Sequence, residues 1–163
     1  MADLEARAKR VLSPVLGHYT WLPVERGEGS WLVVEGGRRV LDLTCGIAVT
    51  PVGHAHPKVV AAVIAQAQKL SHICAGVTLY EPNVALAEEL IKVTPSGLDT
   101  VFFGNSGAEA IEGSIKLARQ ATRRQAVIVF RGGFHGRSTG AMAVTTSKAA
   151  YRRGYGALLP ESL

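Results

Sequence analysis

The chain has 163 residues, of which 47% are hydrophobic, so it can bury the core of one domain or pieces of two. Its formal net charge is +5, but the Lys and Arg residues are scattered, which argues against a nucleic-acid-binding patch. The two cysteines give no disulfide framework, and no apolar run resembles a signal peptide or a membrane span, so we expect a cytoplasmic protein without membrane contacts.

The first third of the chain predicts a short helix, a hairpin and a loop. Apolar residues at helical spacing indicate a helix over residues 3–12. Two β-rich runs, 31–34 and 39–43, flank a Gly-Gly turn, which is a strong hairpin signal. Residues 44–56 are rich in Gly, Pro and His and are expected to form a loop.

Two helices are predicted to open at a proline, where the missing N–H group costs nothing. The first runs from Pro57 to about Leu70, and the second begins at Pro82. Both carry an apolar stripe, which we expect to be buried. The predicted buried residues are Val60, Val63, Ile64 and Ala67 in the first helix and Leu86, Leu90 and Ile91 in the second.

The remainder of the chain alternates between strand and helix, the pattern of an α/β sheet. Residues 100–103 and 126–130 are predicted strands, and the second is apolar enough for a parallel sheet covered on both faces. A helix is expected from Gly107 to about Ala121, a short one over 138–144, and a loop over 151–163.

The junction between the first of these strands and its helix predicts an anion site. The first N–H groups of a helix lack intrahelical acceptors and lie at the positive end of its dipole. Gly107 leaves room for a close anion, and the Ser106 hydroxyl adds a donor. Ser106 and Glu109 also form a capping-box pattern, so a simple helix cap is an alternative interpretation.

A second segment, Gly133 to Arg137, follows the next predicted strand. Phe134 offers a ring on which a planar cofactor can stack, and Arg137 offers a bidentate partner for a carboxylate. Taken singly, each residue is more often structural: Phe134 an ordinary core residue, His135 a surface or hydrogen-bonded histidine and Arg137 a solvated charge. Their joint position after a strand, where α/β proteins bind ligands, favours a site.

Three motifs together resemble the class III aminotransferases, which use pyridoxal phosphate. They are Phe103–Ala110 with the following helix, Phe134–Arg137, and Leu41–Val49 with Gly53–Pro57. The resemblance runs in order from about Trp21 to Pro160, and is closest to the 4-aminobutyrate branch. It implies an α/β fold: residues 56–163 are the first part of the fold-type I large domain, a parallel-rich sheet with helices on both faces. Residues 1–55 are then the hairpin segment of the small domain.

The resemblance also implies roles for single residues. It implies amino transfer between an amino acid or ω-amino acid and a 2-oxo acid, and a homodimer. It assigns no metal ligand and no catalytic residue to this chain. The residues it implies as cofactor-binding are Ser106, Gly107, Ala108, Phe134 and His135, and those it implies as substrate-binding are Ile47 and Arg137.

The resemblance further implies that the chain is truncated, because none of its six lysines has the sequence context of the family's catalytic lysine. We therefore expect the chain alone to be inactive, as a remnant or as the partner of a separate chain that carries the C-terminal part. A racemase of the same family is another alternative. A metal site at His54 and His56 and a nucleotide-binding module are less favoured, because neither has its usual motif.

Overall fold

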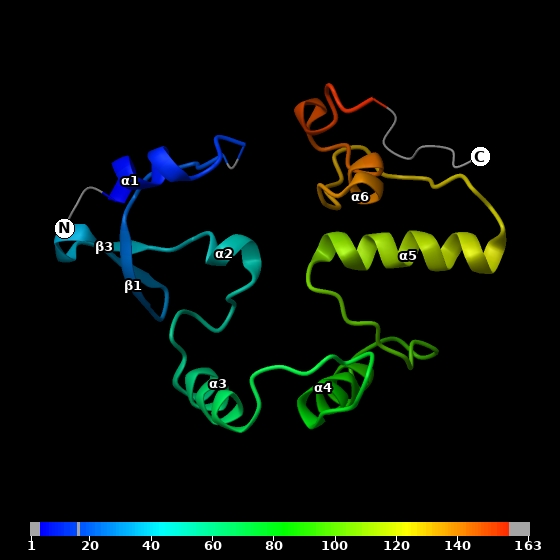
Figure 1. Cartoon of the computed structure of the whole chain (residues 1–163), viewed down its shortest axis with the longest axis horizontal. Coiled ribbons are helices and arrows are strands. Elements are labelled where there is room, and N and C mark those ends of the chain that lie inside the picture. The colour runs from blue at the N-terminus through cyan, green and yellow to red at the C-terminus, as the bar shows by residue number, and fades with distance from the viewer. Residues whose placement is uncertain (1–3, 16, 157–163) are drawn as a thin grey trace. The chain divides into compact units, whose positions relative to one another are not determined.

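The computed structural model describes residues 4–15 and 17–156, and they fall into two compact units, residues 1–78 and 79–163 (Figure 1). Each unit is described by itself, and the predicted domain boundary at residue 55 stays a prediction. The elements of the first unit are α1 (Leu4–Val11), β1 (Val24–Glu28), β2 (Trp31–Val34), η1 (Glu35–Gly37), β3 (Arg39–Leu41), α2 (Cys45–Ala48) and α3 (Pro57–Lys69). Those of the second are α4 (Glu81–Ile91), α5 (Gly107–Thr122), α6 (Thr139–Ala143) and η2 (Ala149–Tyr151).

The first unit is built on a three-stranded antiparallel sheet with the strand order β1-β2-β3. The predicted hairpin is confirmed as β2 and β3, joined by η1. Gly36 and Gly37 have φ angles of 81° and 77° there, the left-handed region that glycine enters without strain. Val33 and Val34 of β2 are almost fully buried and form the core of this sheet.

Strand β1 was not predicted, because its sequence, VERGE, lacks alternating apolar residues. It forms through pairing with β2, and Gly27 within it allows a close contact. A Cβ atom at Gly27 would lie 2.5 Å from the Cβ and Cγ atoms of His54. The strand therefore depends on a tertiary contact that local propensity does not report.

The predicted helices α1, α3, α4, α5 and α6 all form, within the described residues and to within one or two residues at their ends. The predicted burial of α3 and α4 is wrong, since neither helix contains a buried residue. Val60, Val63 and Ile64 are exposed because no other described element packs over their stripe. Residues 157–163 of the predicted terminal loop lie outside the described residues.

The second unit has its core where α6 meets α5. Ala141, Met142, Val144 and Thr145 are buried there, and α5 itself contributes only half-buried residues to the contact. Figure 1 shows α6 beside α5. The helix α5 ends at Thr122, and its C-cap residue, Arg123, adopts a left-handed conformation with φ 59°.

The predicted strands at 100–103 and 126–130 are not strands in the structure. Neither segment is helical, and neither pairs with a neighbouring strand through backbone hydrogen bonds. No described residue of the second unit belongs to a strand. A strand exists only through hydrogen bonds to a neighbour, which an apolar sequence alone does not supply. As a result Phe102, Ile128 and Phe130 are exposed, Ile128 to 97%.

These exposed side chains predict that the isolated chain binds a hydrophobic dye in native buffer. The double variant Ile128→Ser with Phe130→Ser should lower dye fluorescence, because both side chains are almost fully exposed. It should change the free energy of unfolding by less than about 0.5 kcal/mol, as surface substitutions do. Dye titration and urea unfolding of both proteins measure this. A monomer that unfolds cooperatively and binds no dye would contradict the prediction.

Candidate functional site

Helix α5 begins at the residue that the sequence predicts, with Gly107 as its first residue. Ser106 is the N-cap: its backbone is extended, and its Oγ accepts a hydrogen bond from the Glu109 N–H at 3.2 Å. The Glu109 carboxylate in turn accepts the Asn105 N–H at 2.7 Å. The cap therefore uses neither the Gly107 nor the Ala108 N–H, and no acceptor for these two lies among the described residues.

A hollow of ≈ 690 Å³, open to solvent, lies against this helix start. It combines two segments separated by some thirty residues in the sequence, and a Cβ atom added at Gly107 would meet no atom within 4 Å. All predicted site residues except Ser106 and Ile47 line it. The residues that matter here are Gly107, Ala108, Ile111, Phe134, His135 and Arg137.

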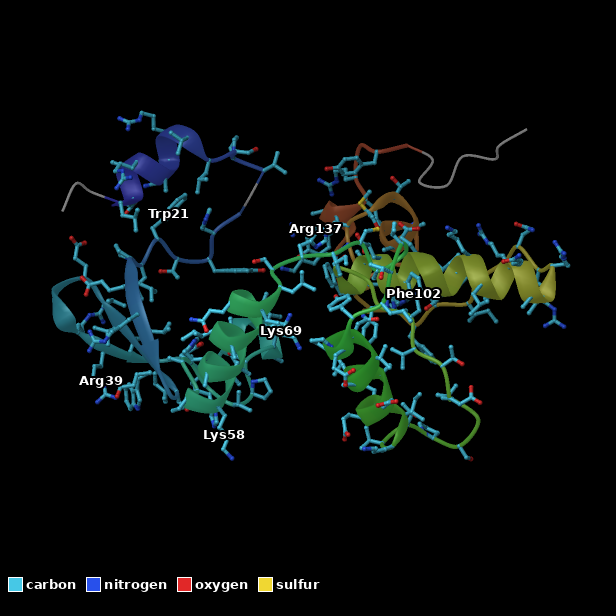
Figure 2. The ribbon with its side chains drawn as sticks, turned by 60° about the horizontal axis from the view of Figure 1, so that its bottom comes forward. Trp21, Arg39, Lys58, Lys69, Phe102 and Arg137 are labelled. Carbon is cyan, nitrogen blue, oxygen red and sulfur yellow. The ribbon has the colours of Figure 1, made fainter. Side chains whose placement is uncertain are left out.

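Two exposed side chains give this hollow its chemical character. Arg137 lies beside the start of α5 (Figure 2), and its guanidinium has no ion-pair or hydrogen-bond partner among the described residues. The Phe134 ring, 55% exposed, contacts Tyr151 edge-on at a centroid distance of 5.6 Å. A cation, an aromatic ring and free N–H groups therefore share one hollow, which favours a planar anionic ligand.

Gly136 brings these two segments together. Its φ angle is 135°, and a Cβ atom there would lie 2.7 Å from the Ala108 Cβ and 3.0 Å from the Ala141 Cβ. Thr145, fully buried behind the loop, holds it: its Oγ1 accepts the His135 N–H at 3.0 Å and lies 3.0 Å from the Gly136 carbonyl. The loop can lie this close to α5 only because residue 136 has no side chain.

Glu112, on the next turn of α5, fastens α6 to α5. Its Oε1 accepts the Ser138 hydroxyl at 2.7 Å and the N–H groups of Gly140 and Ala141 at 2.8 and 3.0 Å. The Ser138 hydroxyl above all, and these two N–H groups with the Lys116 charge, hold the pKa of Glu112 below its ordinary value against an opposing effect of burial. Sequence reasoning missed Glu112, because the partner it caps lies 26 residues away.

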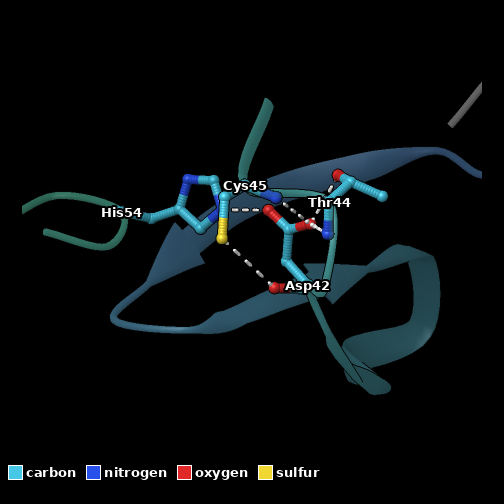
Figure 3. A network of polar contacts seen from close by, with 4 residues as sticks. All are labelled: Asp42, Thr44, Cys45 and His54. Atoms are coloured by element: carbon cyan, nitrogen blue, oxygen red, sulfur yellow. Dashed lines mark hydrogen bonds and ion pairs between the residues drawn. The ribbon is translucent and has the colours of Figure 1, made fainter. Parts of the chain in front are cut away.

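A second polar cluster, in the first unit, also escaped sequence reasoning (Figure 3). Asp42, which follows β3, is nearly buried, and its Oδ1 accepts the Thr44 hydroxyl and the N–H groups of Thr44 and Cys45 at 2.7–3.0 Å. Its Oδ2 accepts the His54 Nε2–H at 2.7 Å. The Thr44 hydroxyl, His54 and these N–H groups hold the pKa of Asp42 well below its usual range.

This cluster anchors the turn α2, which carries the predicted substrate residue Ile47. Cys45, Gly46, Ile47 and Ala48 have φ angles of 46–64°, a left-handed turn that costs the non-glycine residues free energy. The segment was predicted as a loop. It is held in this conformation by Asp42 at its start, and the Ile47 side chain is exposed.

The alternative of a metal site at His54 and His56 finds no support in the described residues. No three His, Cys, Asp or Glu side chains gather there as a metal site would require, and His54 is engaged with Asp42. None of the helices in the described part of the chain is both long and apolar enough to cross a bilayer.

A family profile for aminotransferase class-III matches residues 13–163. The chain belongs to the class III aminotransferase family. It is 44% identical over 139 residues to the 4-aminobutyrate aminotransferase of Mycobacterium leprae, covering 85% of this chain and 31% of that protein. It is 42% identical over 138 residues to the 5-aminovalerate aminotransferase of Pseudomonas putida, covering 84% and 32%.

Similarity to a solved aminotransferase structure confirms the predicted α/β fold class. The adenosylmethionine-8-amino-7-oxononanoate aminotransferase of Methanocaldococcus jannaschii superposes with a TM-score of 0.83 and 31% identity, over 91% of this chain and 37% of that one. The chain thus spans about a third of the length of the relatives it matches. Enzymes of the class III family depend on pyridoxal phosphate.

The contact at Gly136 predicts a large cost for adding one methyl group. Gly136→Ala should destabilise the second unit by about 1–3 kcal/mol, because the new Cβ overlaps Ala108. Gly132→Ala is the matched control: its φ is also positive, at 87°, but its Cβ would meet nothing within 4 Å. Hydrogen exchange at the Ala141 amide measures the difference. Equal effects of the two substitutions would contradict the role of the close contact.

The Asp42 cluster predicts acid sensitivity of the first unit. Because the folded state lowers the pKa of Asp42, the unfolded state binds the proton first as the pH falls. The stability that Asp42 contributes should be complete above its unfolded pKa of about 4 and lost progressively below it. Asp42→Asn should lower stability at pH 7 and flatten this loss, whereas Glu35→Gln, an exposed control, should do neither. Fluorescence of Trp21 and Trp31, the chain's two tryptophans, reports this unit.

Proposed function

We propose that the hollow at the start of α5 binds pyridoxal 5'-phosphate together with an amino acid or ω-amino acid, for amino transfer to a 2-oxo acid. The observation that carries the proposal is the presence of two uncommitted helix N–H groups and an unpaired guanidinium in one hollow. The N–H groups and the guanidinium each bind anions. The N–H groups belong to the start of α5, and the guanidinium belongs to the loop that contains Arg137.

The residues present fit such a cofactor. The first-turn N–H groups of Gly107 and Ala108, with no side chain at 107, suit a phosphate, and the Ser106 hydroxyl remains able to donate while its oxygen caps the helix. Phe134 is exposed enough to stack on a pyridine ring, and His135 lines the same hollow. When bound, pyridoxal phosphate supplies an electron sink for the substrate's carbanion.

The roles of this chain's own residues are binding and orientation. The α5 start holds the phosphate and so fixes one end of the ligand. Arg137 holds the substrate carboxylate through paired N–H donors, and Phe134 restricts the plane of the ring. Each of these contacts lowers the entropy cost of bringing substrate and cofactor together. The protein thus supplies binding and orientation, and the cofactor supplies the chemistry.

An ω-amino acid is the substrate class we favour. The chain is similar to a 4-aminobutyrate and a 5-aminovalerate aminotransferase, and both of these amino acids are unbranched chains with a carboxylate at one end. Ile111 adds an apolar wall to the hollow, which suits such a methylene chain. Ile47 stays our candidate substrate-binding residue on the ground of the family resemblance alone.

Transfer also needs an amine that acts as a base, and we place this lysine outside the 163 residues. The exposed segments around Phe102 and Ile128 provide surfaces on which further polypeptide of the family's fold can pack. A homodimer, or a separate chain that carries the rest of the fold, is the arrangement we propose, in the cytoplasm.

The phosphate site predicts that the chain binds pyridoxal 5'-phosphate more tightly than pyridoxal. Gly107→Pro is a sharp test, because proline is tolerated at the first helical position but has no N–H group. The extended backbone of Ser106 is compatible with a following proline. The substitution should weaken binding of the phosphate form by roughly tenfold, the loss of one hydrogen bond to a charged group, and leave pyridoxal binding unchanged.

Calorimetric titration of both ligands measures this preference. Lys58→Ala is the control, because Lys58 is an exposed residue of the first unit and lines no part of the hollow. Equal affinity of the unmodified chain for pyridoxal and pyridoxal phosphate would refute the phosphate site.

The absence of a lysine in the family's context predicts no turnover by the chain alone. It should form no covalent adduct with pyridoxal phosphate that borohydride fixes, and should not transaminate 4-aminobutyrate with 2-oxoglutarate. Turnover that persists through purification, and that Lys148→Ala abolishes, would show that this chain carries its own base. Lys148 is the first candidate because its partner Tyr151 contacts Phe134.

A further inference from the structure

Two glycines on one segment meet two residues on one face of α5. A Cβ atom at Gly136 would lie 2.7 Å from the Ala108 Cβ, and one at Gly140 would lie 2.1 Å from the Glu112 Oε2. Gly136 and Gly140 are four residues apart, as are Ala108 and Glu112, and four residues correspond to about one turn of α5. The 136–140 segment is thus placed against α5 at two successive points: at Gly136 a side chain would overlap the Ala108 Cβ, and at Gly140 it would displace the Glu112 carboxylate.

Glu112 completes this contact through hydrogen bonds. Its Oε1 accepts from the Ser138 hydroxyl, the Gly140 N–H and the Ala141 N–H, all at 2.7–3.0 Å. Arg137 lies between the two attachments: Gly136, on one side, rests on Ala108, and Ser138, on the other, is bonded to Glu112. The backbone of Arg137 is therefore fixed on both sides relative to α5.

The first N–H groups of α6 are capped by a carboxylate from a different helix, Glu112 of α5. The Ser138 side chain forms no capping bond of its own to α6, and the first turn of α6 contains no acidic residue. A carboxylate from within α6 would cap that helix equally well. A carboxylate from α5 also ties the cap to the helix whose first N–H groups, at Gly107 and Ala108, face the hollow.

We propose that Glu112 is a positioning residue that sets the spacing between Arg137 and the start of α5. The hollow then selects ligands whose phosphate and carboxylate groups are separated by one particular length. This inference rests on the proposed function, because it takes the α5 start as the phosphate site and Arg137 as the carboxylate site. It adds the residue that controls the distance between them.

The chain offers a graded set of variants. Glu112→Gln keeps an acceptor oxygen at the atom where the three hydrogen bonds converge but removes its charge. Glu112→Ala removes all three, and Ser138→Ala removes one while leaving the two N–H groups capped. If Glu112→Ala fails to fold, the comparison of Ser138→Ala with Glu112→Gln still measures the positioning effect.

The experiment uses two probes on the 163-residue chain: inorganic phosphate, and a series of unbranched ω-phosphonocarboxylates of increasing methylene number. The unmodified chain should bind one length roughly tenfold or more tightly than lengths two methylenes away, since two linked groups gain affinity only when the linker matches the span. Glu112→Gln should keep this optimum. Glu112→Ala should bind inorganic phosphate unchanged but lose the optimum, and Ser138→Ala should show a smaller loss.

Three results would overturn the inference, and they are distinguishable. An optimum that Glu112→Ala retains shows that Glu112 does not set the spacing. Loss of inorganic phosphate binding in Glu112→Ala shows a structural role at the α5 start rather than a positioning role. Failure of the unmodified chain to bind inorganic phosphate refutes the proposed function itself, and the inference with it.

Discussion

The contact between the Gly136 backbone and Ala108 is the constraint on which the second unit depends. It brings an aromatic ring and a guanidinium to the start of α5, and this start otherwise has only free N–H groups to offer a ligand. Thr145 bonds the loop at His135 and Gly136, and Glu112 bonds the residues that follow it, Ser138, Gly140 and Ala141. The walls of the hollow come from segments that are far apart in the sequence. Its shape therefore depends on the close contact that holds these segments together.

The first unit uses a carboxylate in a related way. Asp42 accepts three hydrogen bonds on one oxygen and the His54 ring on the other, and so fixes the entry into a left-handed turn. Glu112 likewise gathers three donors on one oxygen. In both places an ionised side chain stabilises a short segment that has few apolar contacts of its own, and hydrogen bonds to a charged acceptor are stronger than neutral ones.

The chain's burial is small for its apolar content. Its local elements form, yet α3, α4 and α5 have no fully buried residue, and the apolar segments around Phe102 and Ile128 lie open to solvent. The chain spans about a third of the length of the class III relatives that it matches, and its described residues form a single three-stranded sheet. The helices form although the segments around Phe102 and Ile128 do not become strands, because helices and caps satisfy their own backbone groups whereas a strand needs a partner.

The sequence by itself determined the helices, the β2–β3 hairpin, the cap at Ser106 and the family, because each depends on residues close together in the chain or on motifs in fixed order. It also pointed to Phe134 and Arg137 as neighbours of the α5 start, through their position after an apolar segment. Only the tertiary structure decided the roles of Glu112, Thr145 and the Asp42–His54 pair, since their partners lie 9–29 residues away. It also decided against strands at 100–103 and 126–130, because a ladder requires a neighbouring strand that an apolar pattern cannot provide.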